Sequence, residues 1–150
     1  LEYKVSDIET KNRKTSAPAP FMTSTLQQTA SSMLGFSPRK TMQIAQKLYE
    51  GVKTPLGNMG IITYMRTDSL NIAKEAQQSA IEYIEQNYGK KYVEPKTFKS
   101  KSQNAQEAHE AIRPTKIELI PNEMKNYLSN DEFKLYNLIY NRFLASQMKS

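Results

Sequence analysis

Residues 61–69 read Ile61-Ile62-Thr63-Tyr64-Met65-Arg66-Thr67-Asp68-Ser69. The β-branched and aromatic side chains at the start of this run favour a strand from Ile61 to Arg66. Side chains two positions apart share one face of a strand, so Tyr64 and Arg66 point the same way, about 6.6 Å apart. The segments on both sides have helical spacing. The sequence therefore predicts a mainly helical α+β domain with a short strand that carries Tyr64.

Two helices are expected before this strand. Apolar side chains recur at helical spacing after Ser24, which matches the first position of a capping box, and Gly35 ends that stretch. Ser37 and Pro38 supply an N-cap and a first-turn proline for a second helix, and Gly51 closes it. Two short helices joined by a tight turn with a glycine favour a helix-turn-helix, although many all-helical domains contain such pairs.

A glycine-rich loop over residues 51–60 leads to the strand, and a third helix follows it. The N-cap of this helix is expected at one of three polar residues, Asp68, Ser69 or Asn71. The helix runs to about Tyr88, where Gly89 ends it. Residues 90–101 then hold five lysines and one glutamate, which gives a local net charge of 5 − 1 = +4.

The last third of the chain is predicted to hold one strand and one long helix. Residues 108–115 favour a short strand that Pro114 ends, and we expect it to pair around Ile112 with the strand of Tyr64 in a small antiparallel sheet. A short helical turn is expected after Pro121. Residues 129–132 match a capping box and open the longest apolar stripe in the sequence.

Composition narrows the possible chemistry. The chain has 150 residues, 21 − 15 = +6 formal charges, no cysteine and one histidine, His109. These counts exclude disulfides, thiolate zinc sites and sites built from several histidines, so we expect no metal site. The basic balance favours a nucleic acid as partner, but an excess of lysine is also common on inert surfaces. No apolar run is long enough for a membrane span, and the start at Leu1 rather than Met suggests a piece of a longer protein.

Tyr64 and Arg66 form a chemically useful pair. A phenol is a weak nucleophile near its usual pKa of about 10, and nearby positive charge favours the phenolate. A guanidinium also holds a phosphate through two parallel hydrogen bonds. The alternative is a half-buried strand tyrosine beside a solvated arginine, which is the more common arrangement for this pattern.

Other charged residues give weaker indications. His109 is followed by Glu110, but Arg113 stands where a zinc motif of the H-E-x-x-H type needs a second histidine. Arg39 and Lys40 lie on the second helix, where they contact a phosphate backbone or form a solvated face. Spacing alone does not separate these two alternatives.

Four segments of the chain together resemble the type IA DNA topoisomerases, the bacterial DNA topoisomerase I group. The segments are Pro20–Gln28, Ile62–Ser69, Gln106–Thr115 and Arg142–Met148. They occur in family order and span nearly the whole chain from Pro18 onward. A chance match to all four is not credible.

The resemblance implies a role for each matching residue. Tyr64 aligns with the nucleophile that becomes joined to a 5′ phosphate of DNA, and Arg66 with the arginine that contacts the scissile phosphate. His109 aligns with a histidine near that phosphate, and Asp68 with a nearby acidic residue. We expect further DNA contacts from Thr63, Arg113, Arg39 and Lys40.

The resemblance also implies the domain organisation and the partners. Residues 1–20 would be a lead-in from a preceding domain, and residues 21–150 would be the gate domain with CAP-like helices. Mg²⁺ would be bound by a TOPRIM domain that this sequence lacks, as it lacks C-terminal zinc ribbons. The expected partners are single-stranded or negatively supercoiled DNA and other domains of the same chain, in the cytoplasm at the nucleoid. The fragment alone is expected to be inactive.

Two alternatives come from other classes. One is a helix-turn-helix regulator that binds DNA without chemistry. The other is a tyrosine recombinase, which would join Tyr64 to a 3′ phosphate. Recombinases need an arginine–histidine–arginine set, and the sequence matches their motifs poorly.

Overall fold

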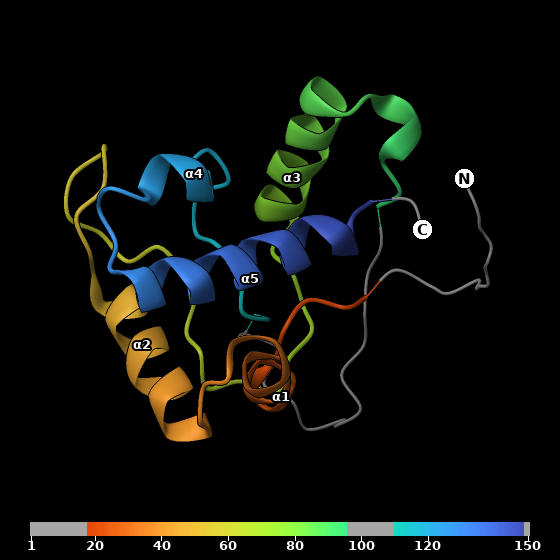
Figure 1. The fold of residues 1–150 in the computed structure, drawn as a ribbon. Coiled ribbons are helices and arrows are strands. Elements are labelled where there is room, and N and C mark those ends of the chain that lie inside the picture. Colours follow the sequence, from red (N-terminus) through yellow and green to blue (C-terminus); the bar gives the residue numbers. More distant parts are fainter. Residues whose placement is uncertain (1–17, 96–109, 149–150) are drawn as a thin grey trace, which may run out of the picture.

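A computed structural model describes residues 18–95 and 110–148, which form a mainly helical fold (Figure 1). The helices of the described residues are α1 (Thr23–Leu34), α2 (Pro38–Glu50), α3 (Lys74–Asn87), the 3-10 helix η1 (Lys90–Tyr92), α4 (Pro121–Met124) and α5 (Asn130–Ser146). The mainly helical class is as expected. The expectations for residues 1–17, for the second half of the basic segment 90–101 and for His109 lie outside the described residues.

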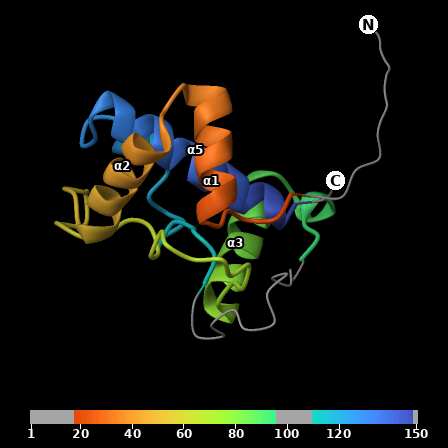
Figure 2. The ribbon, with the colours of Figure 1, turned by 90° about the horizontal axis from the view of Figure 1, so that it is seen from below.

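Helix α5 lies at the centre of the helical core. It contacts α1, α2 and α4, and α1 contacts α2 (Figures 1 and 2). The core between these helices holds fully buried Leu26 from α1, Leu48 from α2 and Tyr136, Ile139 and Phe143 from α5. The helical spacing of these apolar residues in the sequence matches the face that each helix buries.

The turn between α1 and α2 has the predicted chemistry. Gly35 has φ 71°, a left-handed conformation that glycine adopts without steric cost. The Ser37 side chain accepts a hydrogen bond from Lys40 N at 3.1 Å, and Pro38 occupies the first turn of α2. The start of α1 differs from the predicted cap at Ser24. The helix begins at Thr23, and Thr25 Oγ1 instead accepts from Met22 N at 3.0 Å.

Helix α3 begins at Lys74, later than the three predicted N-caps. Asp68, Ser69 and Asn71 precede the helix, where Thr67 Oγ1 accepts from Ser69 N and Ser69 Oγ accepts from Asn71 N. The N-cap residue is Ala73, and its N–H donates to Glu110 Oε1 at 2.9 Å. The residue before the helix is therefore held by a distant carboxylate and not by a local capping side chain, so no local pattern marks the start of α3.

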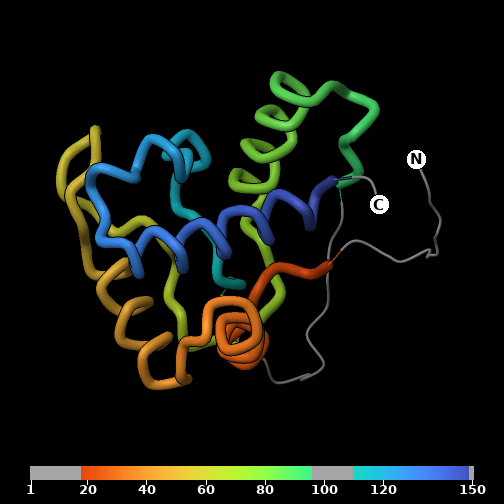
Figure 3. The backbone as a smooth tube through the Cα atoms, viewed as in Figure 1, coloured from red at the N-terminus to blue at the C-terminus, as the bar shows by residue number. Residues whose placement is uncertain are grey.

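The small sheet expected around Tyr64 is reduced to isolated antiparallel bridges within the residues that the structure describes. These bridges join Phe21 to Ile112, Val52 to Met59, Ile62 to Pro114 and Val93 to Met148. The tyrosine segment does pair with the segment around Ile112, as predicted, through the bridge between Ile62 and Pro114; both segments can be followed in Figure 3. The pairing stops at one bridge because two further donors bond elsewhere: Ile61 N donates to Leu48 O, and Arg113 N donates to the Thr63 hydroxyl.

The capping box at the start of α5 is confirmed. Ser129 Oγ accepts from Glu132 N at 3.2 Å, and Glu132 Oε1 accepts from Ser129 N at 3.0 Å. Farther along α5, the buried Tyr136 hydroxyl donates to Leu119 O at 2.6 Å. The Arg142 guanidinium lies 4.5 Å from the centre of the Phe21 ring and donates to Ala19 O. Helix α5 thus holds both the segment before α4 and the segment before α1.

Candidate active site: an exposed tyrosine on a clamped segment

The segment that carries Tyr64 is held at its beginning by α2. Ile61 N donates to Leu48 O at 2.9 Å, so the segment satisfies a carbonyl in the last turn of the helix. Gly60 lies so close to α2 that a Cβ there would clash with the backbone carbonyl oxygen of Tyr49. The absence of a side chain at position 60 is what permits this approach.

The middle of the segment is held by the chain around Arg113. Thr63 N donates to Arg113 O at 2.9 Å, and Thr115 N donates to Ile61 O at 3.0 Å. The Thr63 hydroxyl donates to Ala111 O at 2.7 Å and accepts from Arg113 N at 3.0 Å. Thr63 is a residue that we expected to contact DNA, but its hydroxyl donates one hydrogen bond and accepts another inside the fold.

The end of the segment is held by Thr23 in the first turn of α1. The Thr23 hydroxyl donates to Met65 O at 2.6 Å and accepts from Thr67 N at 2.8 Å. Thr23 N also donates to Thr67 O at 2.9 Å. Three separate parts of the fold therefore fix the backbone on both sides of Tyr64.

This clamping leaves alternate side chains exposed. Met65 is fully buried and Thr67 is buried, whereas Tyr64, Arg66 and Asp68 are exposed. The alternation agrees with the period of two predicted for an extended segment. Tyr64 is 44% exposed, so it lies at the surface of the fold.

Tyr64 makes a ring contact with Tyr49 in the last turn of α2. The two ring centres are 5.2 Å apart and the ring planes meet at 66°, an edge arrangement. Tyr49 is itself 40% exposed. The exposed surface around Tyr64 therefore includes a second tyrosine.

Arg113 forms a close ion pair with Glu110. Its Nε and Nη2 donate to the two carboxylate oxygens at 2.7 and 2.8 Å, and Nη1 donates to Pro114 O at 3.0 Å. Burial works to raise the pKa of Glu110, but the hydrogen bonds from Arg113 and Ala73 and the charge of Arg113 outweigh it, so the pKa lies below its ordinary value. The guanidinium expected to contact DNA is held in place by this pair, with its side chain 11% exposed.

The two basic residues at the start of α2, Arg39 and Lys40, lie away from Tyr49 and Tyr64. Lys40 Nζ is 3.0 Å from Asp131 Oδ2 and 4.6 Å from the centre of the Phe36 ring. Tyr49 comes nine positions after Lys40 in the helix, which is about 13 Å along the axis. Arg39, also exposed, is one residue farther away, so the structure does not bring these two cations to the tyrosine.

Sequence reasoning did not find Thr23, Tyr49 or Gly60 as parts of the site. Thr23 is one of several hydroxyl residues around the start of α1, and Tyr49 is one of several large side chains in the last turns of α2. Gly60 was one of three glycines in a loop. No local sequence pattern marks these three residues. Thr23 bonds to Met65, Tyr49 contacts Tyr64, and Gly60 lies against Tyr49, and all three contacts form only in the folded chain.

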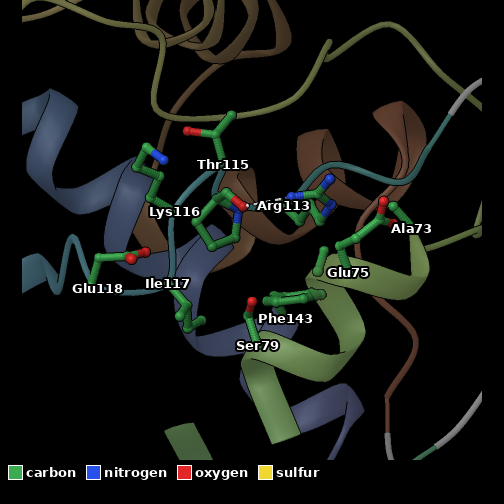
Figure 4. Close-up of a pocket in the computed structure, with 11 residues that line it drawn as sticks. Ala73, Glu75, Ser79, Arg113, Thr115, Lys116, Ile117, Glu118 and Phe143 are labelled. Atoms are coloured by element: carbon green, nitrogen blue, oxygen red, sulfur yellow. Dashed lines mark hydrogen bonds between the residues drawn. The ribbon is translucent and has the colours of Figure 1, made fainter. Parts of the chain in front are cut away.

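A polar pocket of about 380 Å³ lies between α3 and the segment 113–118 (Figure 4). Glu75 and Ser79 line it from α3, Glu118 lines it from the opposite segment, and Phe143 lines it from α5. Tyr64 and Arg66 do not line this pocket. It is therefore separate from the tyrosine surface.

The described residues offer no obvious metal centre. Residues 18–95 and 110–148 contain no group of three or more histidine, cysteine, aspartate or glutamate side chains placed to hold an ion. The donors in this part of the chain therefore do not fit a resident Mg²⁺. In the same part of the chain, none of the helices has the length and apolar character that crossing a membrane needs.

Comparison with known proteins identifies the family. The family model described as DNA topoisomerase matches residues 1–150. The chain belongs to the bacterial DNA topoisomerase I family. It is 65% identical over 149 residues to DNA topoisomerase 1 of Helicobacter pylori, strain ATCC 700392 / 26695, a match that covers 98% of this chain and 20% of that protein. It is 61% identical over 148 residues to DNA topoisomerase 1 of Campylobacter jejuni, covering 97% of this chain and 21% of that protein.

A solved structure has the same fold. The full-length topoisomerase I from Thermotoga maritima matches with a TM-score of 0.79 and 50% identity, covering 91% of this chain and 21% of that chain. The chain thus spans about a fifth of the length of the relatives that it matches.

Proposed function

We propose that this chain is the gate domain of a type IA DNA topoisomerase and carries its nucleophile, Tyr64. The observation that carries the proposal is an exposed tyrosine on a segment whose backbone is fixed on both sides. A nucleophile must be reachable by a large substrate and held in a narrow range of positions, because misplacement of about 1 Å costs catalysis heavily. The family membership of the whole chain supports the same assignment.

In this proposal the Tyr64 hydroxyl attacks a phosphorus atom of single-stranded DNA. The bond from phosphorus to the 3′ oxygen breaks, the phenol loses its proton, and the departing 3′ oxygen takes up a proton. The tyrosine is left joined to the 5′ phosphate. Reversal of the same step reseals the strand. Because the bond between Tyr64 and the phosphate retains the energy of the broken DNA bond, resealing needs no ATP.

Nearby residues have proposed roles in positioning the phosphate. Arg66 is exposed two residues after Tyr64, and a guanidinium near the phosphate would offset the charge that develops on its oxygens. Asp68 is an exposed acidic residue of the same segment, and we propose that it and His109 act near the phosphate. Thr63, Arg113, Arg39 and Lys40 remain proposed DNA contacts, of which Thr63 and Arg113 would contribute through the backbone that they hold.

The remaining parts of the reaction belong to the longer protein. We place Mg²⁺ in a TOPRIM domain outside this chain, because the described residues offer no fitting donor set. The chain would then act on negatively supercoiled DNA with other domains of the same protein, as a gate that lifts to pass a strand. The proposed compartment is the cytoplasm, at the nucleoid.

A covalent-adduct assay tests this function. The full-length protein containing this chain is mixed with a single-stranded oligonucleotide and Mg²⁺, denatured with detergent, and separated by gel electrophoresis. The wild type is expected to form a protein–DNA adduct, and Tyr64→Phe to form none while it still binds the oligonucleotide. Adducts formed by Tyr64→Phe would overturn the proposal.

The alternative is a helix-turn-helix module that binds DNA without chemistry. The tight turn between α1 and α2 favours this reading. It predicts binding without adduct for both the wild type and Tyr64→Phe, so the same gel separates the two functions.

A further inference from the structure

We propose that Tyr49 is a positioning residue for Tyr64, holding the plane of its ring ready for attack on the phosphate. The inference rests on the proposed function of Tyr64 and adds a residue that acts through it. It starts from the geometry of the two rings, whose centres are 5.2 Å apart at 66°.

The backbone clamps leave the Tyr64 side chain free to rotate about its own bonds. Every hydrogen bond described for the segment fixes main-chain atoms or the hydroxyls of Thr23 and Thr63. With 44% of its surface exposed, Tyr64 has few neighbours to restrict its rotamer. A ring packed edge-on against it restricts both side-chain torsions, because rotation of the Tyr64 ring would lose this favourable edge arrangement of the aromatic pair.

Tyr49 is itself placed rigidly enough to serve this purpose. It lies in the last turn of α2, and its neighbour Leu48 accepts the hydrogen bond from Ile61 N at 2.9 Å. Gly60 lies directly against the Tyr49 carbonyl group. The backbones that carry the two rings are thus joined within a few residues of each ring, so the ring-to-ring spacing is set by the fold.

The position of Tyr49 on the surface also argues against a purely structural role. Its ring is 40% exposed, although α2 has a buried face that holds Met42, Ala45 and Leu48. A partly exposed aromatic side chain adds less to the core than these residues do. The Tyr49 ring instead contacts the exposed ring of Tyr64.

The test is a series of substitutions at position 49 in the full-length protein. Tyr49→Phe and Tyr49→His keep a flat ring, whereas Tyr49→Leu and Tyr49→Met remove it. The measured quantities are the single-turnover rate of adduct formation, the dissociation constant for the oligonucleotide, and the free energy of unfolding. Tyr127→Leu is the matched control, because Tyr127 is an exposed tyrosine with 44% of its surface accessible on the turn after α4.

The expected result is a rate that depends on the presence of a ring. Tyr49→Leu and Tyr49→Met should slow adduct formation about tenfold with the dissociation constant unchanged. Tyr49→Phe should restore the wild-type rate, and Tyr127→Leu should leave it unaltered. A structural role alone would not separate the rate from binding and stability in this way.

Other results would overturn the inference. These are wild-type rates in Tyr49→Leu and Tyr49→Met, or loss of folding in both, which would make Tyr49 a residue of the fold alone. Tyr64→Phe in the same series keeps the two proposals distinct. Adducts formed by Tyr64→Phe would reject the proposed function, whereas adduct loss in Tyr64→Phe with unaltered Tyr49 variants would reject this inference only.

Discussion

The tyrosine segment approaches α2 closely because Gly60 has no Cβ. Gly60→Ala would drive a Cβ into the carbonyl oxygen of Tyr49, and backbone atoms cannot move aside cheaply. We expect this substitution to lower the free energy of unfolding by about 1–3 kcal/mol, the usual range for overpacking. Urea denaturation followed by circular dichroism measures it.

Asn58→Ala is the control for this prediction. Asn58 is exposed in the same loop, so its substitution should change the free energy of unfolding by less than about 0.5 kcal/mol. Equal effects of the two substitutions would show that the loop as a whole, rather than the close approach at position 60, matters for stability.

Glu110 is the residue for which the structure predicts a pH dependence. Its pKa is lowered in the fold from 4.5, despite burial, by the Arg113 and Ala73 hydrogen bonds and the Arg113 charge. A carboxyl with a lowered pKa stabilises the fold when ionised, so its contribution is present above about pH 4.5. The contribution is lost as the pH falls from there through the pKa of the folded state.

The measurement compares the wild type with Glu110→Gln across that range. The difference between their free energies of unfolding should be largest near neutral pH and should shrink as the pH falls below about 4.5. A difference that stays constant with pH would show that the charge of Glu110 does not contribute, and that its hydrogen-bonding shape alone matters.

At the scale of the elements, the sequence predicted what depends on local contacts. The capping box of α5 and the Gly35 turn are formed by residues within a few positions of each other. The predicted start of α3 was wrong. The backbone N–H of its N-cap residue, Ala73, donates to Glu110, which is 37 residues away in the sequence. The clamp at Thr23 spans 42 residues to Met65, so it too has no local pattern. Long-range hydrogen bonds therefore account for most of what the sequence did not predict.

The local prediction can be tested at Ser129. Ser129→Ala removes the acceptor for Glu132 N at the start of α5. We expect a loss of about 1 kcal/mol in the free energy of unfolding, the typical value for an N-cap. Ser32→Ala, an exposed position inside α1, should instead leave stability unchanged or slightly raised, since alanine favours helix. A neutral Ser129→Ala would mean that other contacts of α5 replace the cap.

At the scale of the whole molecule, the chain holds an exposed tyrosine but, in its described part, no set of metal donors. It also spans about a fifth of the length of its relatives. The account therefore predicts that residues 1–150 alone do not relax a negatively supercoiled plasmid, whereas the full-length protein does. Gel electrophoresis of plasmid topoisomers measures this. Ordinary turnover by the isolated chain would contradict the division of the active site between domains.

The central claim is that Tyr64 becomes joined to a 5′ phosphate, and the direction of that linkage is the most direct test. The full-length protein is incubated with Mg²⁺ and an oligonucleotide labelled at its 3′ end, then denatured and digested, and the labelled peptide is sequenced. The account predicts that the 3′ label stays with the peptide that contains Tyr64 and that a 5′ label does not. A linkage that retains only the 5′ label, or one that maps to another residue, would contradict it.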